Sequence, residues 1–388
     1  MTTTDTRRGP DRVVPRLVGD EPGLLAHPGP HQWLFRVGAY EDLPRLIGLT
    51  GATRIAVLHG RIGWGKARVF LPDVDSLARD VIDIPFAGEC CPEEIERVRD
   101  ILVRADVHAL LAIGGGKVLD TAKAAGLRAG DVPVVLAPTL ASNCSAWACL
   151  SVLYEADGTP IGHEIHPGAA HTVVVEPRVL LDSPPAFLLA GIADTLAKWY
   201  ECAGNLTAAP GWDLCAGLAR HAALQCRDLL AAHAEAAMAD IRAGVLTESL
   251  LTVFQVNIAT AGLVGAFGGA FGRATAAHAI HDGLSVLPSL HGALHGTKVA
   301  YGTLVQLVLE DRWEEVAELD GLHDRLGLPH TLAELGCVEP FEEAVATIAR
   351  VATLPGKTIH DLPTPVGAAD VARAVRRLEE HESLRSRG

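Results

Sequence analysis

The chain has 388 residues, 49% of them hydrophobic, and carries a formal net charge of −14. This length is too great for one compact core and favours two domains. The acidic balance argues against nucleic acid as a partner, because phosphate backbones are bound by clustered Lys and Arg. No apolar run reaches the length of a membrane span without charged or polar interruption, so no membrane partner is expected either.

The cysteines and the first dozen residues indicate the cellular compartment of the protein. The eight cysteines are scattered, with no C-x-x-C pair and no small-domain framework. This pattern is typical of reduced, mostly buried thiols. The arginines near the N-terminus are not followed by a hydrophobic segment, so they do not form a secretory signal. The sequence therefore predicts a cytoplasmic protein.

After a loose N-terminal tail over residues 1–30, residues 31–185 are predicted to form an α/β domain. The expected strands are Gln32–Val37, Arg54–His59, Ala109–Ile113, Val132–Leu136 and His171–Glu176. The expected helices between them are Tyr40–Leu49, Glu93–Ala105 and Val118–Leu127. Apolar strands without clean alternation are buried on both faces, and their alternation with helices predicts a mainly parallel sheet.

The composition changes after the proline pair Pro184–Pro185. From there to Gly265 the sequence is rich in Ala and Leu with helical period, and strand signals almost vanish. Residues 186–388 are therefore predicted to form an all-α domain.

A glycine run, Gly114-Gly115-Gly116, followed by Lys117, stands between an expected strand and an expected helix. Glycines let the backbone approach a pyrophosphate, and a helix start offers free N–H groups and the positive end of a dipole. Lys117 would add a charge beside the phosphates. The alternative is a glycine-rich turn that binds nothing, because short glycine motifs often match by chance.

Candidate metal ligands gather in the second half of the chain. Asp194 lies in a helical pattern, and His278, His281, His291 and His295 lie in one short segment. A carboxylate plus two imidazoles is a normal ligand set for Zn²⁺ or Fe²⁺. The alternative for each histidine is a helix cap or a satisfied core group.

Two further histidines, His163 and His166, fall in a Gly/Pro-rich connection. They are expected on a surface loop rather than at a metal.

At this point the residues resemble glycerol dehydrogenase and its relatives in the iron-containing (group III) alcohol dehydrogenase superfamily, which also includes dehydroquinate synthase. The resemblance runs from roughly Trp33 to the C-terminus. It is carried by GGGKVLDTAK at Gly114–Lys123, APTLAS at Ala137–Ser142, LSVLY at Leu150–Tyr154, GIADTLAKWYE at Gly191–Glu201, AHAIHDG at Ala277–Gly283 and HGTKVAYGTLVQL at His295–Leu307. The implied fold is a dinucleotide-binding α/β domain followed by a helical metal-binding domain.

The resemblance implies Asp194, His278 and His295 as ligands of one divalent metal ion. Iron enzymes of the superfamily carry a further histidine four residues after the aspartate, where this chain has Lys198. A three-residue ligand set follows, with Zn²⁺ favoured over Fe²⁺.

The same resemblance implies where a dinucleotide binds. Gly115, Gly116 and Lys117 would hold the pyrophosphate, and four further residues would line the cofactor path, namely Thr139, Ser142, Leu150 and Tyr154. Relatives that prefer NAD place an acidic residue after the strand that here is Arg54–His59. This chain continues instead with Gly60 and Arg61, and Arg can pair with a 2′-phosphate, so NADP is favoured over NAD.

The substrate pocket departs from glycerol dehydrogenases. These have an aspartate two residues after the position of Ser142, whereas this chain has Asn143 followed by Cys144. SNCSAW, together with AKWYE and TIHDLP, is most similar to the branch that reduces 2-oxo acids. In that branch Lys198 would pair with the substrate carboxylate; its alternative is an ordinary salt bridge on a helix face.

The predicted function is a metal-dependent, NAD(P)-linked oxidoreductase that interconverts a small polar alcohol, either a polyol or a 2-hydroxy acid, and its carbonyl by hydride transfer. His281, near the metal but spare as a ligand, is the predicted proton relay beside Lys198. One alternative is a dehydroquinate-synthase-like cyclase or lyase without net redox change, and another is a non-catalytic dinucleotide-binding protein. The resemblance also implies a homo-oligomer, a dimer or larger.

Overall fold

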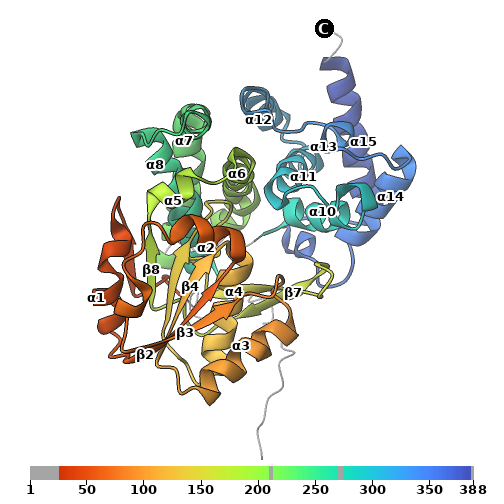
Figure 1. The fold of residues 1–388 in the computed structure, drawn as a ribbon. Coiled ribbons are helices and arrows are strands. Elements are labelled where there is room, and N and C mark those ends of the chain that lie inside the picture. The colour runs from red at the N-terminus through yellow and green to blue at the C-terminus, as the bar shows by residue number, and fades with distance from the viewer. Residues whose placement is uncertain (1–25, 209–212, 270–271, 273, 386–388) are drawn as a thin grey trace, which may run out of the picture.

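The computed structural model describes residues 26–208, 213–269, 272 and 274–385. Most of the predicted N-terminal tail, residues 1–25, lies outside the described residues. The expected fold class is confirmed, since a parallel-sheet half is followed by a helical half that lies at one end of it (Figure 1).

Six parallel strands form the central sheet in the order β1-β8-β5-β4-β2-β3. Their bounds are β1 Gln32–Phe35, β2 Arg54–His59, β3 Asp80–Pro85, β4 Ala109–Gly114, β5 Val134–Pro138 and β8 Thr172–Val175. His59 pairs with Ile113, and Gly114 with Pro138, so the carboxyl ends of the central strands meet at one edge. Ligands of parallel α/β sheets bind at that edge.

Both faces of the sheet are buried, as continuous apolar strands require. Ile55 and Val57 of β2 point into one apolar cluster with Tyr40, while the alternate residues Ala56 and Leu58 point into a larger cluster. The covering helices are η1 Ala39–Asp42, α1 Leu43–Gly48, α2 Arg61–Ala67, η2 Val74–Ser76, α3 Pro92–Arg104 and α4 Gly116–Arg128.

Several elements differ from the sequence-based expectation. β3 was not predicted, because DVIDIP is an edge strand whose side chains are mostly solvent-accessible and only Ile84 is buried. A two-stranded antiparallel sheet, β6 Leu150–Tyr154 with β7 Pro160–Ile165, was not predicted, and β7 enters the Gly/Pro-rich connection that was expected to be loop. The surface-loop prediction for the two histidines there is wrong: His163 lies on β7, and His166 is buried with its Nε2 2.8 Å from the Ser151 hydroxyl.

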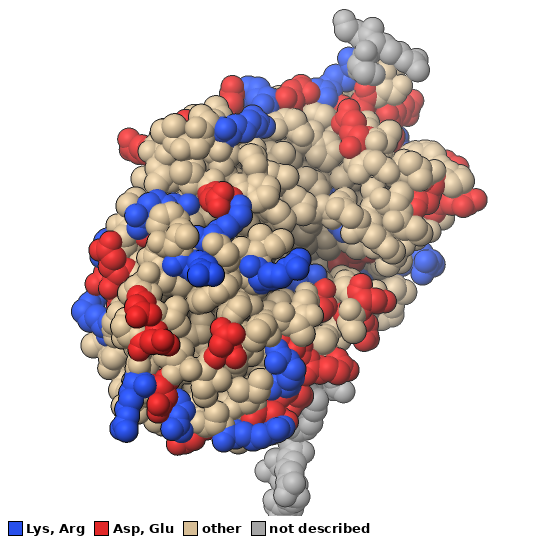
Figure 2. Space-filling model, viewed as in Figure 1, with Lys and Arg blue, Asp and Glu red and all other residues tan. Residues whose placement is uncertain are grey.

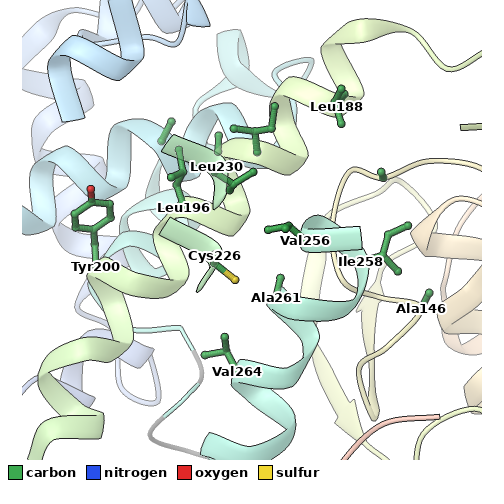
Figure 3. Close-up of a cluster of buried hydrophobic side chains, with 14 of the residues drawn as sticks. Ala146, Leu188, Leu196, Tyr200, Cys226, Leu230, Val256, Ile258, Ala261 and Val264 are labelled. Atoms are coloured by element: carbon green, nitrogen blue, oxygen red, sulfur yellow. The ribbon is translucent and has the colours of Figure 1, made fainter. Parts of the chain in front are cut away.

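Helices make up the remainder of the described chain. They are α5 Pro177–Leu181, α6 Pro185–Ala208, α7 Leu214–Ala243, α8 Glu248–Gln255, the π-helical turn η3 Val256–Thr260, α9 Ala261–Gly268, α10 Ala276–Ser285, η4 Pro288–Leu290, α11 His295–Leu309, α12 Trp313–Leu326, α13 Leu332–Leu335, α14 Phe341–Ala352, η5 Thr358–Asp361 and α15 Ala368–Arg385. Apolar side chains from α6, α7 and α9 meet in the interior, among them Leu196, Leu230 and Val264 (Figure 3).

One helical run, Glu248–Gly268, is long and apolar enough to cross a bilayer by length and composition alone, with a mean hydropathy of 1.7. Of the most apolar 18-residue stretch of this run, 56% is buried inside the protein, and both α8 and α9 pack on α7. A core helix passes the same test, so the run gives only weak support for a membrane span.

A buried ion pair on α4 fixes the segment that follows β5. Lys123 Nζ lies 2.8 Å from Asp120 Oδ1 and donates to the carbonyls of Ser145 and Ala148 at 2.7 and 3.1 Å. Asp120 in turn accepts from the Ser145 hydroxyl at 2.7 Å. Both charges are almost fully buried, so each depends on the other for compensation.

We expect Lys123→Met to lower the free energy of unfolding by about 3 kcal/mol, because it leaves the buried Asp120 carboxylate without its cation. Urea unfolding followed by circular dichroism measures this. The control is Lys117→Met, whose half-exposed ion pair with Glu89 is expected to contribute below about 1 kcal/mol. Equal losses in the two variants would contradict the argument.

Candidate metal and dinucleotide site

The glycine run forms the turn between β4 and α4, as the sequence predicts. Gly115 precedes the helix, which begins at Gly116, two residues earlier than expected. A Cβ on Gly114 would lie 2.6 Å from the Val118 side chain, so only glycine permits this tight turn. The chain leaves β2 toward β3 and leaves β4 toward β5 on the opposite side, so the turn lies at the topological switch point.

Residues predicted to bind the cofactor, and Asn143 from the predicted substrate pocket, surround this turn. The Thr139 amide donates to the Gly114 carbonyl at 2.9 Å, and a Cβ on Gly116 would lie 3.1 Å from the Asn143 amide nitrogen. Lys117 Nζ pairs with Glu89 at 2.6 Å and lies 4.8 Å from the centre of the Tyr154 ring. The turn therefore carries a balanced charge pair at its rim.

The other predicted cofactor residues lie further along the same edge. The Leu150 carbonyl accepts a hydrogen bond from Lys123. Ser142 packs beside Gly191 of α6, where a Cβ would lie 3.0 Å from the serine Cα. Arg61 opens α2 directly after β2, is exposed, and has no side-chain partner among the described residues.

Asp194, His278 and His295 come together at one point, each from a different helix. Asp194 Oδ1 lies 3.3 Å from His278 Nε2 and 3.5 Å from His295 Nε2. One ligand atom from each of the three lies within 4.8 Å of the others. Asp194 is 4% exposed, and within the described chain its Oδ1 accepts no hydrogen bond.

These distances fit a divalent metal ion. In a tetrahedral site with Zn–N and Zn–O bonds of about 2.0–2.1 Å, neighbouring donors are about 3.4 Å apart. The separations of 3.3 and 3.5 Å match that edge. A buried carboxylate oxygen without a hydrogen bond is also what a cation would satisfy. The donor set therefore fits a metal.

Glycines bring the three helices into backbone contact. A Cβ on Gly296, next to His295, would lie 1.8 Å from the Ala190 carbonyl oxygen of α6. A Cβ on Gly302 would lie 2.4 Å from the Ala277 carbonyl oxygen of α10. No larger residue fits at either place, so α11 rests directly on the helices that carry Asp194 and His278.

Glu201 contacts the ring nitrogen of His278 that points away from Asp194. This residue was not singled out from the sequence. Its Oε2 lies 2.7 Å from His278 Nδ1, and its Oε1 accepts from the Thr275 amide at 2.8 Å. Burial opposes protonation of His278, but Glu201 and Asp194 outweigh it and raise its pKa to about 9. The signal was present, since Glu201 lies seven residues after Asp194 and so two turns along the same helix face.

His281 lies behind His295 rather than among the three donors. Its Nε2 is 2.9 Å from His295 Nδ1, and its Nδ1 is 3.2 Å from Asp282 Oδ1. Burial and then His295 lower the pKa of His281 to about 3, so its ring is neutral. In this position it orients His295, while the predicted proton-relay role stays a prediction. His291, the fourth histidine of the segment, is exposed after η4.

Lys198 and Cys144, the predicted substrate residues, lie close enough for each to affect the pKa of the other. Burial alone would lower the pKa of Lys198, but Asp194 outweighs it and holds the pKa above its usual value. Burial alone would raise the pKa of Asp194. The Lys198 ammonium and the two imidazoles outweigh burial and lower this pKa well below its usual value, so Asp194 stays ionised. Burial raises the pKa of the Cys144 thiol.

The surface is hollowed between the sheet half and the helices α10 and α11, and Lys and Arg side chains gather over α2 on the sheet side of the hollow (Figure 2). His295, whose side chain is 46% exposed, makes the ligand cluster accessible from solvent. A dinucleotide bound to the glycine turn of the sheet half would thus face a substrate bound near Asp194 of the helical half.

Known proteins share this fold and sequence. The family described as iron-containing alcohol dehydrogenase matches residues 30–177. Hydroxycarboxylate dehydrogenase A of Escherichia coli K12 is 35% identical over 370 residues, which are 95% of this chain and 98% of that protein. Glycerol dehydrogenase of Escherichia coli O6:H1 is 39% identical over 73% of this chain and 77% of that protein.

A solved structure agrees with these relatives. That of a probable glycerol dehydrogenase from Sinorhizobium meliloti 1021 superposes with a TM-score of 0.82 at 31% identity, covering 91% of this chain and 97% of that one.

These similarities define a metal-dependent alcohol oxidoreductase that uses a nicotinamide dinucleotide and acts on a small molecule. The chain belongs to the iron-containing alcohol dehydrogenase family. The cyclase and the non-catalytic alternatives are not favoured, since the relatives are named for redox reactions.

We expect Glu201→Gln to weaken Zn²⁺ binding about 10- to 100-fold, because the carboxylate that orients His278 and raises its basicity is lost. The measurement is recovery of turnover as Zn²⁺ is added back to chelated enzyme. Glu248→Gln, at an exposed position at the start of α8, is the control and should match the parent. An unchanged Zn²⁺ requirement in Glu201→Gln would exclude this role.

Proposed function

We propose that the enzyme interconverts a 2-hydroxy acid and its 2-oxo acid, with Asp194, His278 and His295 holding the metal and Lys198 binding the substrate carboxylate. The observation that carries the proposal is the Lys198 ammonium. It lies one helical turn after Asp194, is half-buried, and has no ion pair within 4 Å in the described parts of the chain. The charge of Asp194 offsets the cost of shielding this cation, and a substrate carboxylate would supply the direct ion-pair partner that the described residues do not provide.

Charge balance supports an anionic substrate. A divalent cation with the formal charges of Asp194, Glu201 and Lys198 leaves a net charge of +1 at the site. A monocarboxylate would neutralise it, whereas a polyol would not. The 35% identity with hydroxycarboxylate dehydrogenase A over nearly the whole chain supports the same substrate class.

Two bound groups supply the chemistry: the metal provides Lewis-acid activation at the substrate oxygen, and the dinucleotide gives or accepts the hydride. The residues of the chain position the reactants. Glu201 holds the Nδ1 side of His278, and His281 does the same for His295, so both rings present Nε2 toward Asp194. Lys198 would fix the carboxylate end and thereby aim the carbonyl at the nicotinamide.

The cofactor proposal is NADP(H) with its pyrophosphate on Gly115, Gly116 and Lys117. Arg61, exposed and unpaired among the described residues at the end of β2, is available for a 2′-phosphate. Asp83 lies beside the same strand end, but its carboxylate pairs with His59 at 2.9 Å. For the metal we favour Zn²⁺, since Lys198 occupies the place of a fourth ligand and a cation cannot coordinate.

A polyol is the second candidate substrate, because glycerol dehydrogenases are among the similar proteins. Cys144 disfavours it. Glycerol dehydrogenases have an aspartate at this position, which can accept hydrogen bonds from polyol hydroxyls. The half-buried thiol of Cys144, whose pKa is raised, is only a weak hydrogen-bonding group.

We expect Lys198→Met to lower kcat/KM for 2-oxobutanoate about 100-fold, because a charge-assisted contact with the carboxylate is lost. For the uncharged ketone hydroxyacetone the same change should lower kcat/KM by less than about 3-fold. Steady-state oxidation of NADPH measures both, and Lys66→Met on the surface of α2 is the control. Equal losses for the two substrates would contradict the assignment of Lys198.

Arg61→Ala should raise the KM for NADPH about 10-fold and leave that for NADH unchanged, because only NADPH carries the phosphate. The matched control is Arg68→Ala, an exposed arginine at the other end of α2. The NADP(H) proposal fails if both cofactors are affected alike, or if Arg68→Ala has the same effect.

A further inference from the structure

A second cluster of histidine and carboxylate side chains lies between α12 and α15, on elements other than those that carry the first site. Asp320 of α12 faces His381 and Glu382 of α15. His381 Nε2 lies 3.5 Å from Asp320 Oδ2 and 3.7 Å from Glu382 Oε1. As in the first site, one ligand atom from each residue lies within 4.8 Å of the others.

We propose that this cluster is a second divalent-metal site, of the Zn²⁺ type, which ties the last helix α15 to α12. Two carboxylate oxygens and one imidazole nitrogen are a ligand set that such a cation accepts.

A buried acceptor without a donor points to the cation. Glu382 is 5% exposed, and its Oε1 forms no hydrogen bond in the described chain although it faces Asp320 and His381. Asp320 is equally buried, at 3%. A cation between these two buried carboxylates would satisfy the free oxygen of Glu382.

The distances argue against a simple ion pair with a protonated His381. Charge-assisted hydrogen bonds are about 2.7–2.9 Å long, whereas His381 Nε2 is 3.5 and 3.7 Å from the two oxygens. These separations are instead near the edge of about 3.4 Å expected between donors of a tetrahedral site.

The outer oxygens are held in place, as metal-binding carboxylates usually are. Asp320 Oδ1 lies 3.3 Å from His330 Nδ1, and Glu382 Oε2 accepts from Arg385 Nε at 2.8 Å. Each acid thus has one oxygen fixed and the other directed at the gap. The His381 side chain is 37% exposed, which gives a cation access from solvent.

Zinc stoichiometry tests the proposal. Tag-free protein is stripped with EDTA, reloaded with Zn²⁺, desalted and analysed by mass spectrometry. We expect two zinc ions per chain in the parent, one in Asp194→Asn, one in His381→Ala and none in the double variant Asp194→Asn/His381→Ala. The turnover of His381→Ala should be unchanged. The control His221→Ala, an exposed histidine on α7, should keep two.

A thermal measurement separates binding from a folding defect. Zn²⁺ should raise the melting temperature of Asp194→Asn but not that of Asp194→Asn/Glu382→Gln, which keeps the size of the side chain. The proposal is overturned if Asp194→Asn retains no zinc or if His381→Ala retains as much as the parent. A single zinc that is lost in His381→Ala and kept in Asp194→Asn would uphold this site while contradicting the first.

Discussion

Backbone contact between α6, α10 and α11 is the constraint on which the site depends. Asp194 lies far from His278 and His295 in sequence, and the three donor atoms meet only because Gly296 and Gly302 let α11 lie against the two other helices without intervening side chains. The π-helical turn η3 adds a further contact, since its Asn257 donates to the Ala141 carbonyl at 2.9 Å beside Gly191 of α6. These contacts hold the helical half against the sheet edge that carries the glycine turn, and they would set the distance between a dinucleotide on that turn and a metal ion at Asp194.

Most buried charged side chains of the molecule lie beside a group of opposite charge. Asp120 and Lys123 neutralise each other, and a Glu201 oxygen lies 2.7 Å from His278 Nδ1. At two places a shielded group lacks a close partner among the described residues: the Lys198 ammonium has no ion pair within 4 Å, and Glu382 Oε1 accepts no hydrogen bond. Leaving a buried polar or charged group without a direct partner is unfavourable, so each place indicates a ligand of opposite sign. This reasoning yields an anionic substrate at the first place and a cation at the second.

Local sequence patterns predicted the features that depend on local physics. The strands with continuous apolar runs, the glycine turn after Ala109–Ile113 and the helical second half all follow from periodicity and glycine chemistry, and the fold class is confirmed. Resemblance to a family, rather than pattern, singled out Asp194, His278 and His295. Features created by packing were missed: β3 is a largely exposed edge strand, His166 becomes buried only when the β6–β7 hairpin forms, and Glu201 is visible only as a periodic neighbour of Asp194. The pairing of Asp320 with Glu382 across two helices left no local signal at all.

Anomalous X-ray diffraction at the zinc absorption edge would test the central claim most directly. Crystals of the chelated protein reloaded with Zn²⁺ should show an anomalous peak bounded by Asp194 Oδ1, His278 Nε2 and His295 Nε2, with distances of about 2.0–2.2 Å to each donor. Strong peaks elsewhere, with none among these three residues, would contradict the account of the metal centre and the function built on it.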